Sequence, residues 1–325
     1  MATKKSTNKP VTAYKAFDKD FSCRGFKFEV GKTYKHEGDV VICRSGFHAC
    51  VNPLDVWSYY DLIDTRFAEV ELSGEQVTHD EDSKIAAAEI TIRAEITLPE
   101  FIRNGVAKFI ELVAPGAKKK EEAASGYYAQ LAASGNSAQL AASGDSAQLA
   151  ASGDSAKLAA SGDSAKLAAS GYYAKLAASG YYAQLAASGY YAQLAASGDS
   201  AQLAASGDYA QLAASGYYAQ LAASGNSAQL AASGDSAQLA ASGDYAKLAA
   251  SGNSAQLEVT GKNGVIASAS INGRAKGAVG AWISLAEFND KNECVGFAVG
   301  CIGQDGLEPD SWYRANGGKL VKVED

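Results

Sequence analysis

One short segment near the N-terminus gathers side chains that could bind a metal ion or act as a nucleophile. Its sequence is Cys43-Arg-Ser-Gly-Phe-His48-Ala-Cys50, and a strand would place His48 and Cys50 on the same side. Cys23 and His36 could supply further ligands. The spacing matches no common zinc pattern, so structural cysteines and a hydrogen-bonded histidine are the leading interpretation. A zinc site formed by Cys23, Cys43, His48 and Cys50, or a catalytic role for them, is the alternative.

A set of tyrosines recurs at a spacing that would bring their rings together in a repeating fold. Tyr173, Tyr191 and Tyr209 follow one another at intervals of 18 residues, and the same interval separates Tyr172 from Tyr190. In a coil whose length equals this interval, these side chains form two adjacent outward columns, with rings stacked about 5 Å apart. We predict that this exposed aromatic ladder is a protein-binding surface. The alternative is that the stacked rings only stabilise the coils.

The elements that must position these tyrosines are tandem repeats of nine residues. Glycine recurs every nine residues from Gly126 to Gly252, giving 15 copies, and leucine follows it from Leu131 to Leu257. The unit is Gly, Tyr/Asp/Asn, Tyr/Ser, Ala, Gln/Lys, Leu, Ala, Ala, Ser. Nine residues rotate a helix by about 900°, which puts successive leucines on opposite sides. Each unit would also keep only about six helical residues, too few for a stable helix, so a helical repeat is excluded.

A β-solenoid accommodates the same unit. In a short strand, the alanine before Gln/Lys and the leucine after it point inward, while Gln/Lys and the next alanine point outward. Glycine and Asp/Asn/Ser suit the turns. Two units, the interval between the ladder tyrosines, then form one 18-residue coil with two facing parallel sheets, and a three-sided coil of three units is the alternative. One buried leucine contributes ~1.5–3 kcal/mol, whereas ordering nine residues costs ~9–18 kcal/mol. The coils must therefore stabilise one another, and both ends need caps.

Composition divides the chain into five segments. We predict a disordered lead-in at 1–10, an α+β N-terminal domain at 11–117, a charged junction at 118–122, the repeat solenoid at 123–266 and a β cap domain at 267–325. The fold class is therefore mainly β: a two-sided parallel β-solenoid, capped by an α+β N-terminal domain and a small β C-terminal domain.

Patterns in the flanks predict individual elements. Alternating runs at 66–72 and 88–96 predict strands, and 98–113 predicts a helix with proline in its first turn. Towards the C-terminus we expect two hairpins, one turning at 289–292 and the other at Asn316-Gly317.

Composition also excludes several classes of function. The net charge is −7 and the pI about 5.2, so no basic face for general nucleic-acid binding is expected. No run approaches the ~18 apolar residues of a membrane span. Five cysteines do not form a secreted disulfide framework, which predicts a cytoplasmic protein. No Walker loop, dinucleotide fingerprint or Gly-x-Ser-x-Gly motif is present, so no cofactor is expected. A calcium-binding β-roll would need aspartate where each unit has alanine, as at Ala147, so calcium binding of this kind is not expected.

The layout of the whole chain resembles a family of phage and prophage proteins. The resemblance is carried by Ala13-Tyr-Lys-Ala-Phe, Cys23-Arg-Gly-Phe-Lys-Phe-Glu-Val-Gly-Lys-Thr-Tyr and Ser45-Gly-Phe-His-Ala-Cys at the N-terminus. The Ala-Ala-Ser-Gly repeats, Gly280-Ala-Trp-Ile-Ser-Leu-Ala-Glu and Asp310-Ser-Trp-Tyr complete it. It implies a domain of unknown function joined to a solenoid in a viral setting, and it assigns no activity.

We therefore expect a non-enzymatic binding protein, encoded by a phage and acting in the host cytoplasm. Its solenoid would bind and inhibit a host protein complex of anti-phage defence. A homo-oligomer is also open, whereas membrane attachment and direct nucleic-acid binding are not expected. One alternative is a structural module of the virion. The other is an enzyme in the N-terminal domain, metal-dependent or ADP-ribosyltransferase-like. The order Gly46-Phe-His, Asn52-Pro-Leu-Asp and Phe67-Ala-Glu weakly resembles the latter fold.

Overall fold

The chain divides into two compact units, Met1–Phe109 and Ile110–Asp325, each of which is described by itself. The computed structural model describes residues 5–6, 9–60, 65–78, 83–97, 100–101, 104–105, 108 and 121–324. Within these ranges, no helix has the length and apolar character needed to cross a bilayer.

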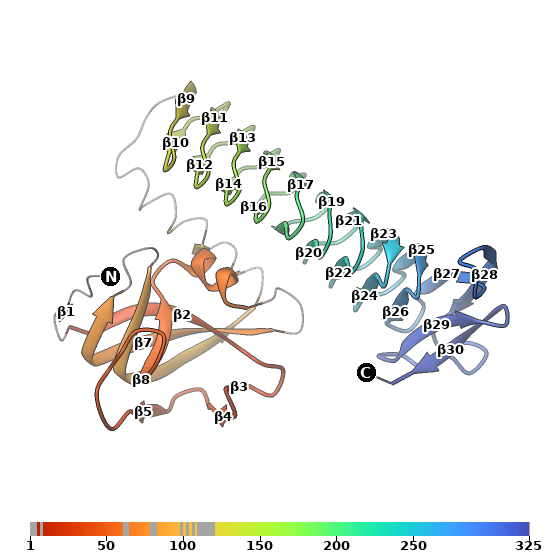
Figure 1. Cartoon of the computed structure of the whole chain (residues 1–325), viewed down its shortest axis with the longest axis horizontal. Coiled ribbons are helices and arrows are strands. Elements are labelled where there is room, and N and C mark those ends of the chain that lie inside the picture. Colours follow the sequence, from red (N-terminus) through yellow and green to blue (C-terminus); the bar gives the residue numbers. More distant parts are fainter. Residues whose placement is uncertain are drawn as a thin grey trace. The chain divides into compact units, whose positions relative to one another are not determined.

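The repeats fold as a parallel β-solenoid in which successive units alternate between two sheets (Figure 1). The odd sheet contains β9 (Glu121–Ser125), β11 (Gln139–Ser143), β13 (Lys157–Ser161), β15 (Lys175–Ser179), β17 (Gln193–Ser197), β19 (Gln211–Ser215), β21 (Gln229–Ser233) and β23 (Lys247–Asn253). The even sheet contains β10 (Gln130–Ser134), β12 (Gln148–Ser152), β14 (Lys166–Ser170), β16 (Gln184–Ser188), β18 (Gln202–Ser206), β20 (Gln220–Ala223), β22 (Gln238–Ala241) and β24 (Gln256–Val259).

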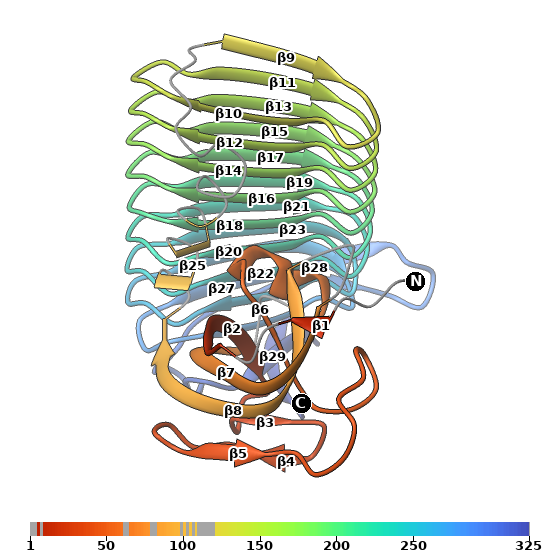
Figure 2. The same cartoon turned by 90° about the vertical axis from the view of Figure 1, so that its left-hand side faces the viewer.

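The register of both sheets confirms the two-sided coil made of two units. Leu158 lies opposite Leu176 in the odd sheet, and Leu149 lies opposite Leu167 in the even sheet. Figure 2 shows the strands stacked rung on rung in this register. The three-sided coil is therefore wrong, because the strand that pairs with each unit is two units away and not three.

The interior of the solenoid is filled by the leucine and two of the three alanines of each unit. Leu149, Ala147 and Ala151 are fully buried and belong to one continuous core cluster. The alanine between Leu149 and Ala151 points outward and lies outside that cluster. Its equivalents on the odd sheet are exposed, as expected, whereas on the even sheet they are 0–1% exposed in the central coils. The two outer faces of the solenoid therefore differ, although their sequences are the same.

From Gly144 to Gly261, the repeat glycine is required because consecutive coils touch at the turn. A Cβ atom on Gly162 would lie 2.6 Å from the carbonyl carbon of Gly144 in the coil below, and closer still to its oxygen. The Gly162 N–H group donates to the Ser179 oxygen, 3.0 Å away in the next coil. Any side chain at this position would push the coils apart.

In the turns, the N–H group of the third residue of the unit donates a hydrogen bond to a neighbouring coil, and the coil that accepts it changes along the solenoid. The Tyr191 N–H group donates to the Tyr172 oxygen of the preceding coil at 2.8 Å, as the equivalent groups do in earlier coils. The Tyr209 N–H group donates instead to the Asn226 oxygen of the following coil at 2.8 Å, and Tyr209 has a left-handed φ of 58°. From this coil onward the turns keep the second orientation.

The parallel ladder continues past residue 266 before the chain reverses. Residue 267, where the cap domain was expected to begin, lies inside β25 (Val265–Ile271). The parallel pairing then includes β26 (Arg274–Gly277) and β27 (Trp282–Phe288). The two expected hairpins follow and are confirmed: β27 pairs antiparallel with β28 (Cys294–Cys301), and β29 (Trp312–Asn316) with β30 (Lys319–Val323).

The N-terminal unit is mostly strands. Its larger sheet contains β1 (Lys5–Ser6), β2 (Val11–Phe17), β5 (Thr33–Lys35), β6 (Phe47–Cys50), β7 (Arg66–Thr78) and β8 (Lys84–Ile96). Since β7 pairs with both β2 and β8, the order β7-β2-β6-β8 closes on itself around a core that includes Phe17, Leu72 and Ile90. A two-stranded ribbon, β3 (Ser22–Cys23) and β4 (Phe26–Lys27), and the 3-10 helix η1 (Pro53–Ser58) complete the unit.

Two expectations concern the ends of this unit. The helix expected at 98–113 falls mostly outside the described residues, although the described positions within it, such as Phe101 and Gly105, are helical. In the lead-in expected to be disordered, Lys5 and Ser6 pair with Val77 and Gln76 of β7.

Candidate binding sites on the solenoid edge and in the N-terminal domain

The structure brings the five tyrosines of the predicted aromatic ladder together. They lie in the turns that lead from β14, β16 and β18 of the even sheet to β15, β17 and β19 of the odd sheet. Tyr172 stacks on Tyr190 with ring centroids 5.2 Å apart and planes 9° apart, and Tyr173 stacks on Tyr191 at 5.4 Å and 7°. Tyr209 extends the second column, 5.3 Å from Tyr191. The predicted columns and their spacing are therefore present.

The rings of the ladder are stacked and still accessible to solvent. Tyr172 and Tyr173 are 45% and 49% exposed, Tyr190 and Tyr191 are each 37% exposed, and Tyr209 is 43% exposed. Partial desolvation, and then the neighbouring tyrosines and Asp208, raise the pKa of Tyr190, and the same causes without Asp208 raise the pKa of Tyr191. These hydroxyl groups therefore remain protonated and can donate hydrogen bonds at neutral pH.

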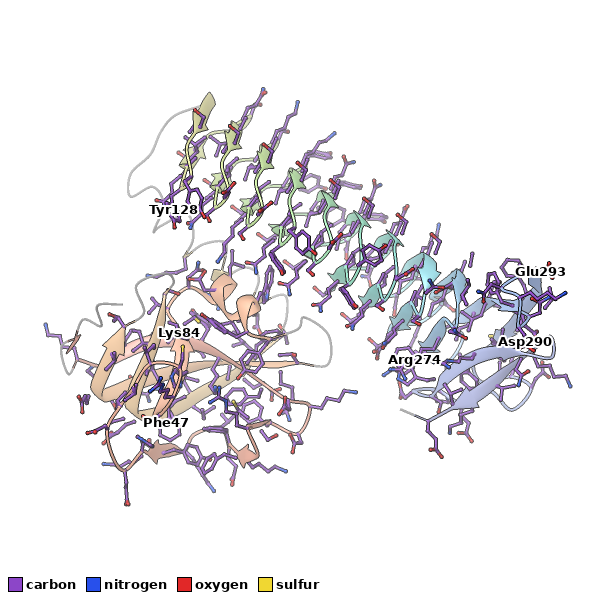
Figure 3. The ribbon with its side chains drawn as sticks, viewed as in Figure 1. Phe47, Lys84, Tyr128, Arg274, Asp290 and Glu293 are labelled. Atoms are coloured by element: carbon purple, nitrogen blue, oxygen red, sulfur yellow. The ribbon has the colours of Figure 1, made fainter. Side chains whose placement is uncertain are left out.

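The opposite edge of the solenoid also carries tyrosines, but they form no ladder. They are the pairs Tyr127–Tyr128, Tyr181–Tyr182 and Tyr217–Tyr218, which lie three and two coils apart. In the described structure their ring contacts occur only within a pair, as between Tyr181 and Tyr182 at 5.0 Å. Figure 3 labels Tyr128 near the first coils. The opposite edge thus presents isolated aromatic pairs of the same composition.

The described cysteines and histidines of the N-terminal unit do not assemble into a metal site. His48 Nε2 accepts a hydrogen bond from the Cys43 N–H group at 2.9 Å, and Cys43 itself is exposed. The Cys23 thiol lies 3.1 Å from the Tyr60 hydroxyl, and Cys50 is buried. Among the described residues, no three His, Cys, Asp or Glu side chains are placed to hold a metal ion. The alternative of a zinc site formed by Cys23, Cys43, His48 and Cys50 is therefore not supported.

His36 was the further candidate ligand. Among the described residues, no interaction joins His36 to His48. Its ring instead faces the edge of Phe47, with centroids 6.5 Å apart. His48 lies on β6, which pairs with β2 on one side and β8 on the other.

A buried lysine beside these residues was missed by the sequence analysis. Lys15 of β2 is 6% exposed, and its ammonium group donates to the His48 carbonyl oxygen at 3.2 Å and to the Cys23 sulfur at 3.5 Å. Burial lowers the pKa of Lys15, and the nearby Cys23 partly opposes this shift. A signal was present in the sequence, because Lys15 alternates with the apolar Ala13 and Phe17 on the inward side of the strand.

His48 is held in its neutral form by its surroundings. Burial lowers its pKa to about 4, and the positive charges of Lys15 and Lys84 act in the same direction. Lys84, at the start of β8, is 7% exposed, and its ammonium nitrogen lies 3.8 Å from the ring centroid of Tyr59. Figure 3 shows Lys84 together with Phe47 of β6 in this unit. Lys15, His48 and Lys84 line one pocket of about 930 Å³.

Comparison with known proteins gives a match to part of the chain. Residues 11–104 match the family described as a domain of unknown function, DUF7666. No curated protein and no solved structure gives a match. The matched range lies within the N-terminal unit and contains Lys15, Cys23, His48, Cys50 and Lys84.

Proposed function

We propose that this chain is a non-enzymatic binding protein that holds a protein partner on its tyrosine ladder, formed by Tyr172, Tyr173, Tyr190, Tyr191 and Tyr209. The observation that carries the proposal is the combination of stacking with exposure: each ring contacts at least one ring of a neighbouring coil, yet more than a third of each side chain faces solvent. Tyrosine is enriched at the centre of protein interfaces, because it offers apolar area together with a hydroxyl group.

The stacking favours a protein partner over a sugar or a nucleic acid. Sugars and bases bind to aromatic side chains through the open ring face. Here the facing sides of Tyr172 and Tyr190, and of Tyr173 and Tyr191, lie against each other. Ring edges and hydroxyl groups are what remain for a partner, and a net charge of −7 gives a phosphate backbone no attraction.

The ladder is also rigid before any partner arrives. Strand register fixes the coils on either side of it, for example Lys175 opposite Gln193 and Gln193 opposite Gln211. Because each ring is already ordered by its neighbours, binding immobilises few additional rotamers, a cost of about 0.5–1.5 kcal/mol for each side chain that is free beforehand. Such preorganisation favours a slow dissociation rate.

The partner class that we propose is a host protein complex of anti-phage defence, in line with the resemblance to phage proteins. A structural role in the virion is the second candidate, and the regular length of the solenoid favours it. The two differ in what they require of the ladder. Recognition depends on the five rings and their hydroxyl groups, whereas a spacer depends only on an intact solenoid.

The test is capture of partners from a host lysate with the full chain, identification by mass spectrometry, and measurement of Kd with the purified partner. The ladder variant replaces all five tyrosines with serine. The matched control replaces the opposite-edge pairs Tyr181–Tyr182 and Tyr217–Tyr218 with serine. We expect the ladder variant to weaken binding at least about 100-fold, since two or more hot-spot side chains are lost, and the control to bind like the wild type. Circular dichroism must show that both variants fold.

A second pair of substitutions separates recognition from stabilisation. Tyr190→Phe and Tyr191→Phe keep the rings and remove only the hydroxyl groups. Weaker binding with unchanged stability supports recognition by the ladder. If the five-serine variant folds and binds the partner with the wild-type Kd, the ladder is not the binding surface.

A further inference from the structure

The last strand of the odd sheet has one edge without a neighbouring strand. In the described structure, β28 pairs with β27 alone, and it ends the order of the odd sheet at the opposite end from β9 (Figure 1). Its sequence, Cys-Val-Gly-Phe-Ala-Val-Gly-Cys, contains no charged residue and no proline. Charged residues and proline commonly protect a free edge, because an open edge pairs readily with another strand. An uncharged strand of eight residues at a free edge is therefore a place where a further strand can join.

The side chains on the outer side of β28 are apolar and exposed. Val295, Phe297 and Val299 alternate along the strand and are 59%, 55% and 59% exposed. Ala298, which lies between two of them, points inward and is fully buried. A stripe of large apolar side chains that faces solvent marks an interaction surface.

Backbone groups of the same residues point towards the free edge. The Ile302 N–H group donates to the Ala281 oxygen at 2.8 Å, so Ile302 directs its backbone towards the chain that leads into β27. Hydrogen-bonded and non-hydrogen-bonded residues alternate along an antiparallel ladder. The ladder is regular from here to Phe297, so the N–H and C=O groups of Val299 and Phe297 point away from β27. A register shift near the hairpin turn leaves Val295 opposite no residue of β27.

The apolar stripe of β28 is symmetric about Phe297. Val295 lies two residues before it and Val299 two residues after it. Two antiparallel copies of β28 that meet at Phe297 therefore place each valine opposite a valine of the other copy, with the two phenylalanine rings side by side. The two Phe297 residues can exchange both of their N–H···O bonds, since their backbone groups point to the shared edge. A two-fold axis requires a surface that is complementary to itself, and this stripe meets the requirement.

From this geometry we propose that the chain forms a two-fold dimer in which the β28 strands of two copies pair antiparallel about Phe297. The odd sheets of the two copies then form one continuous sheet. No tyrosine of the ladder takes part in the interface, so the ladder can bind its partner whether or not the dimer forms.

The size of the contact predicts a reversible dimer. A strand of eight residues is about 26 Å long, and a sheet is about 10 Å thick, which gives a contact of about 260 Å² on each copy. A standard stable interface buries about 800 Å² on each partner. We therefore expect a dimer that dissociates in the micromolar to millimolar range.

Sedimentation velocity of the full chain at concentrations up to about 1 mM tests the dimer. We expect the average mass to rise with concentration from one chain towards two. Phe297→Lys removes the ring pair and places like charges opposite each other, so it should raise the Kd at least about 10-fold. Val265→Lys is the matched control, because Val265 is 44% exposed but lies in an inner strand, opposite Lys247 of the neighbouring coil. It should leave the Kd unchanged.

Two further substitutions test the backbone pairing and the register. Val299→Pro removes an N–H group that points away from β27, which an edge strand tolerates, so the variant should fold and lose the dimer. In a chain whose exposed Cys43 and Cys294 are replaced with serine, Phe297→Cys should form a disulfide between two copies, because the opposed Cα atoms lie about 5.5 Å apart. Val295→Cys in the same background should not, because it faces a valine of the second copy.

Circular dichroism must show that the variants fold. The proposal is overturned if the wild type stays monomeric up to about 1 mM, or if folded Phe297→Lys and Val299→Pro dimerise with the wild-type Kd. It is equally overturned if Val295→Cys forms the disulfide as readily as Phe297→Cys. None of these results affects the tyrosine ladder, since the capture experiment uses substitutions outside β28.

Discussion

Replacing Gly162 with alanine tests how closely the coils of the solenoid are stacked. A Cβ atom at this position would lie 2.6 Å from the carbonyl carbon of Gly144 in the coil below. Ordinary non-bonded carbon–carbon contacts are about 3.5–4.0 Å, so the two coils would have to move apart locally by about 1 Å. The φ of Gly162 is also 154°, a region that alanine rarely adopts.

The cost of this substitution can be built from its parts. The backbone strain contributes about 1–3 kcal/mol, and overpacking of the turn adds a similar amount, about 1–3 kcal/mol. Separating the coils weakens the hydrogen bond from the Gly144 N–H group to the Ser161 oxygen, which is 3.0 Å long. At about 1 kcal/mol, this bond brings the expected destabilisation to about 3–7 kcal/mol.

Two other glycines separate the strain from the contact. Gly126 has a similar φ of 145° and nothing within 4 Å of its Cβ position, so Gly126→Ala should cost only the strain, about 1–3 kcal/mol. At Gly180, φ lies outside the strained range, but its Cβ would be 2.7 Å from the carbonyl carbon of Gly162, so Gly180→Ala isolates the contact.

Urea unfolding followed by far-ultraviolet circular dichroism measures the three free energies, and limited proteolysis locates the weakened turn. We expect Gly162→Ala to be the least stable variant, followed by Gly180→Ala and then Gly126→Ala. If Gly180→Ala is no more destabilising than Gly126→Ala, the coils are not stacked as closely as this geometry requires.

Three further predictions concern single side chains. Tyr191→Ala should lower the free energy of unfolding by about 1–3 kcal/mol, because Tyr191 stacks on rings in two coils, and by more than Tyr182→Ala, which loses one ring contact within its own turn; urea unfolding compares them. His48 should titrate near pH 4 by NMR. Its folded pKa lies below the unfolded value of ~6.5, so the N-terminal domain should lose stability as the pH falls from about 6.5 towards 4, and His48→Asn should reduce that dependence in thermal melts. Hydrogen bonds from Asn253 lower the pKa of Asp235, so their stabilisation is lost as the pH falls through the folded pKa; Asp235→Asn should make the acid limb of the melting curve shallower.

The architecture of the solenoid could be predicted because its constraints repeat. One leucine every nine residues, with a glycine at a fixed distance, allows only a turn–strand unit, and the small inward alanines favour two close sheets. The same reasoning placed the ladder tyrosines, since a period of two units alone decides which side chains stack. Leu158 opposite Leu176 and Tyr173 on Tyr191 follow from one and the same register.

The direction of the turn peptides could not be predicted in this way. Asp199-Ser200 and Asp235-Ser236 are identical pairs at equivalent positions, but Ser200 donates its N–H group to the preceding coil and Ser236 to the following one. The two orientations are close in energy for this unit, so the choice depends on neighbouring coils and not on the local residues.

The N-terminal pocket could not be predicted for a different reason. Lys15, His48 and Lys84 are far apart in sequence, and only the antiparallel pairing of β2, β6 and β8 brings them together. In a periodic sequence the period determines which residues pair between strands. The N-terminal domain has no such period, so its strand pairing cannot be deduced in this way. The sequence analysis missed Lys15, and the alternation of Lys15 with Ala13 and Phe17 could have indicated a buried cation but not its surroundings.

The change in turn direction gives the tyrosine ladder a structural role that can be separated from recognition. In the described turns, no backbone hydrogen bond joins residues 189–191 to residues 207–209, because the Tyr191 N–H group donates backward and the Tyr209 N–H group donates forward. At this edge the two coils are connected outside the strands by the rings of Tyr191 and Tyr209, 5.3 Å apart, and of Tyr190 and Tyr209, 5.4 Å apart.

Removing the Tyr209 ring should therefore open the solenoid at this boundary more than removing the ring of Tyr173, whose turn keeps the backbone bond to Asp154 at 2.7 Å. Hydrogen exchange followed by mass spectrometry compares Tyr209→Ser with Tyr173→Ser over residues 193–215. Faster exchange there in Tyr209→Ser alone is the expected result, since local opening requires fewer bonds to break where the turn bonds are missing. Equal exchange in the two variants would show that strand pairing alone, such as Gln193 opposite Gln211, holds the boundary closed.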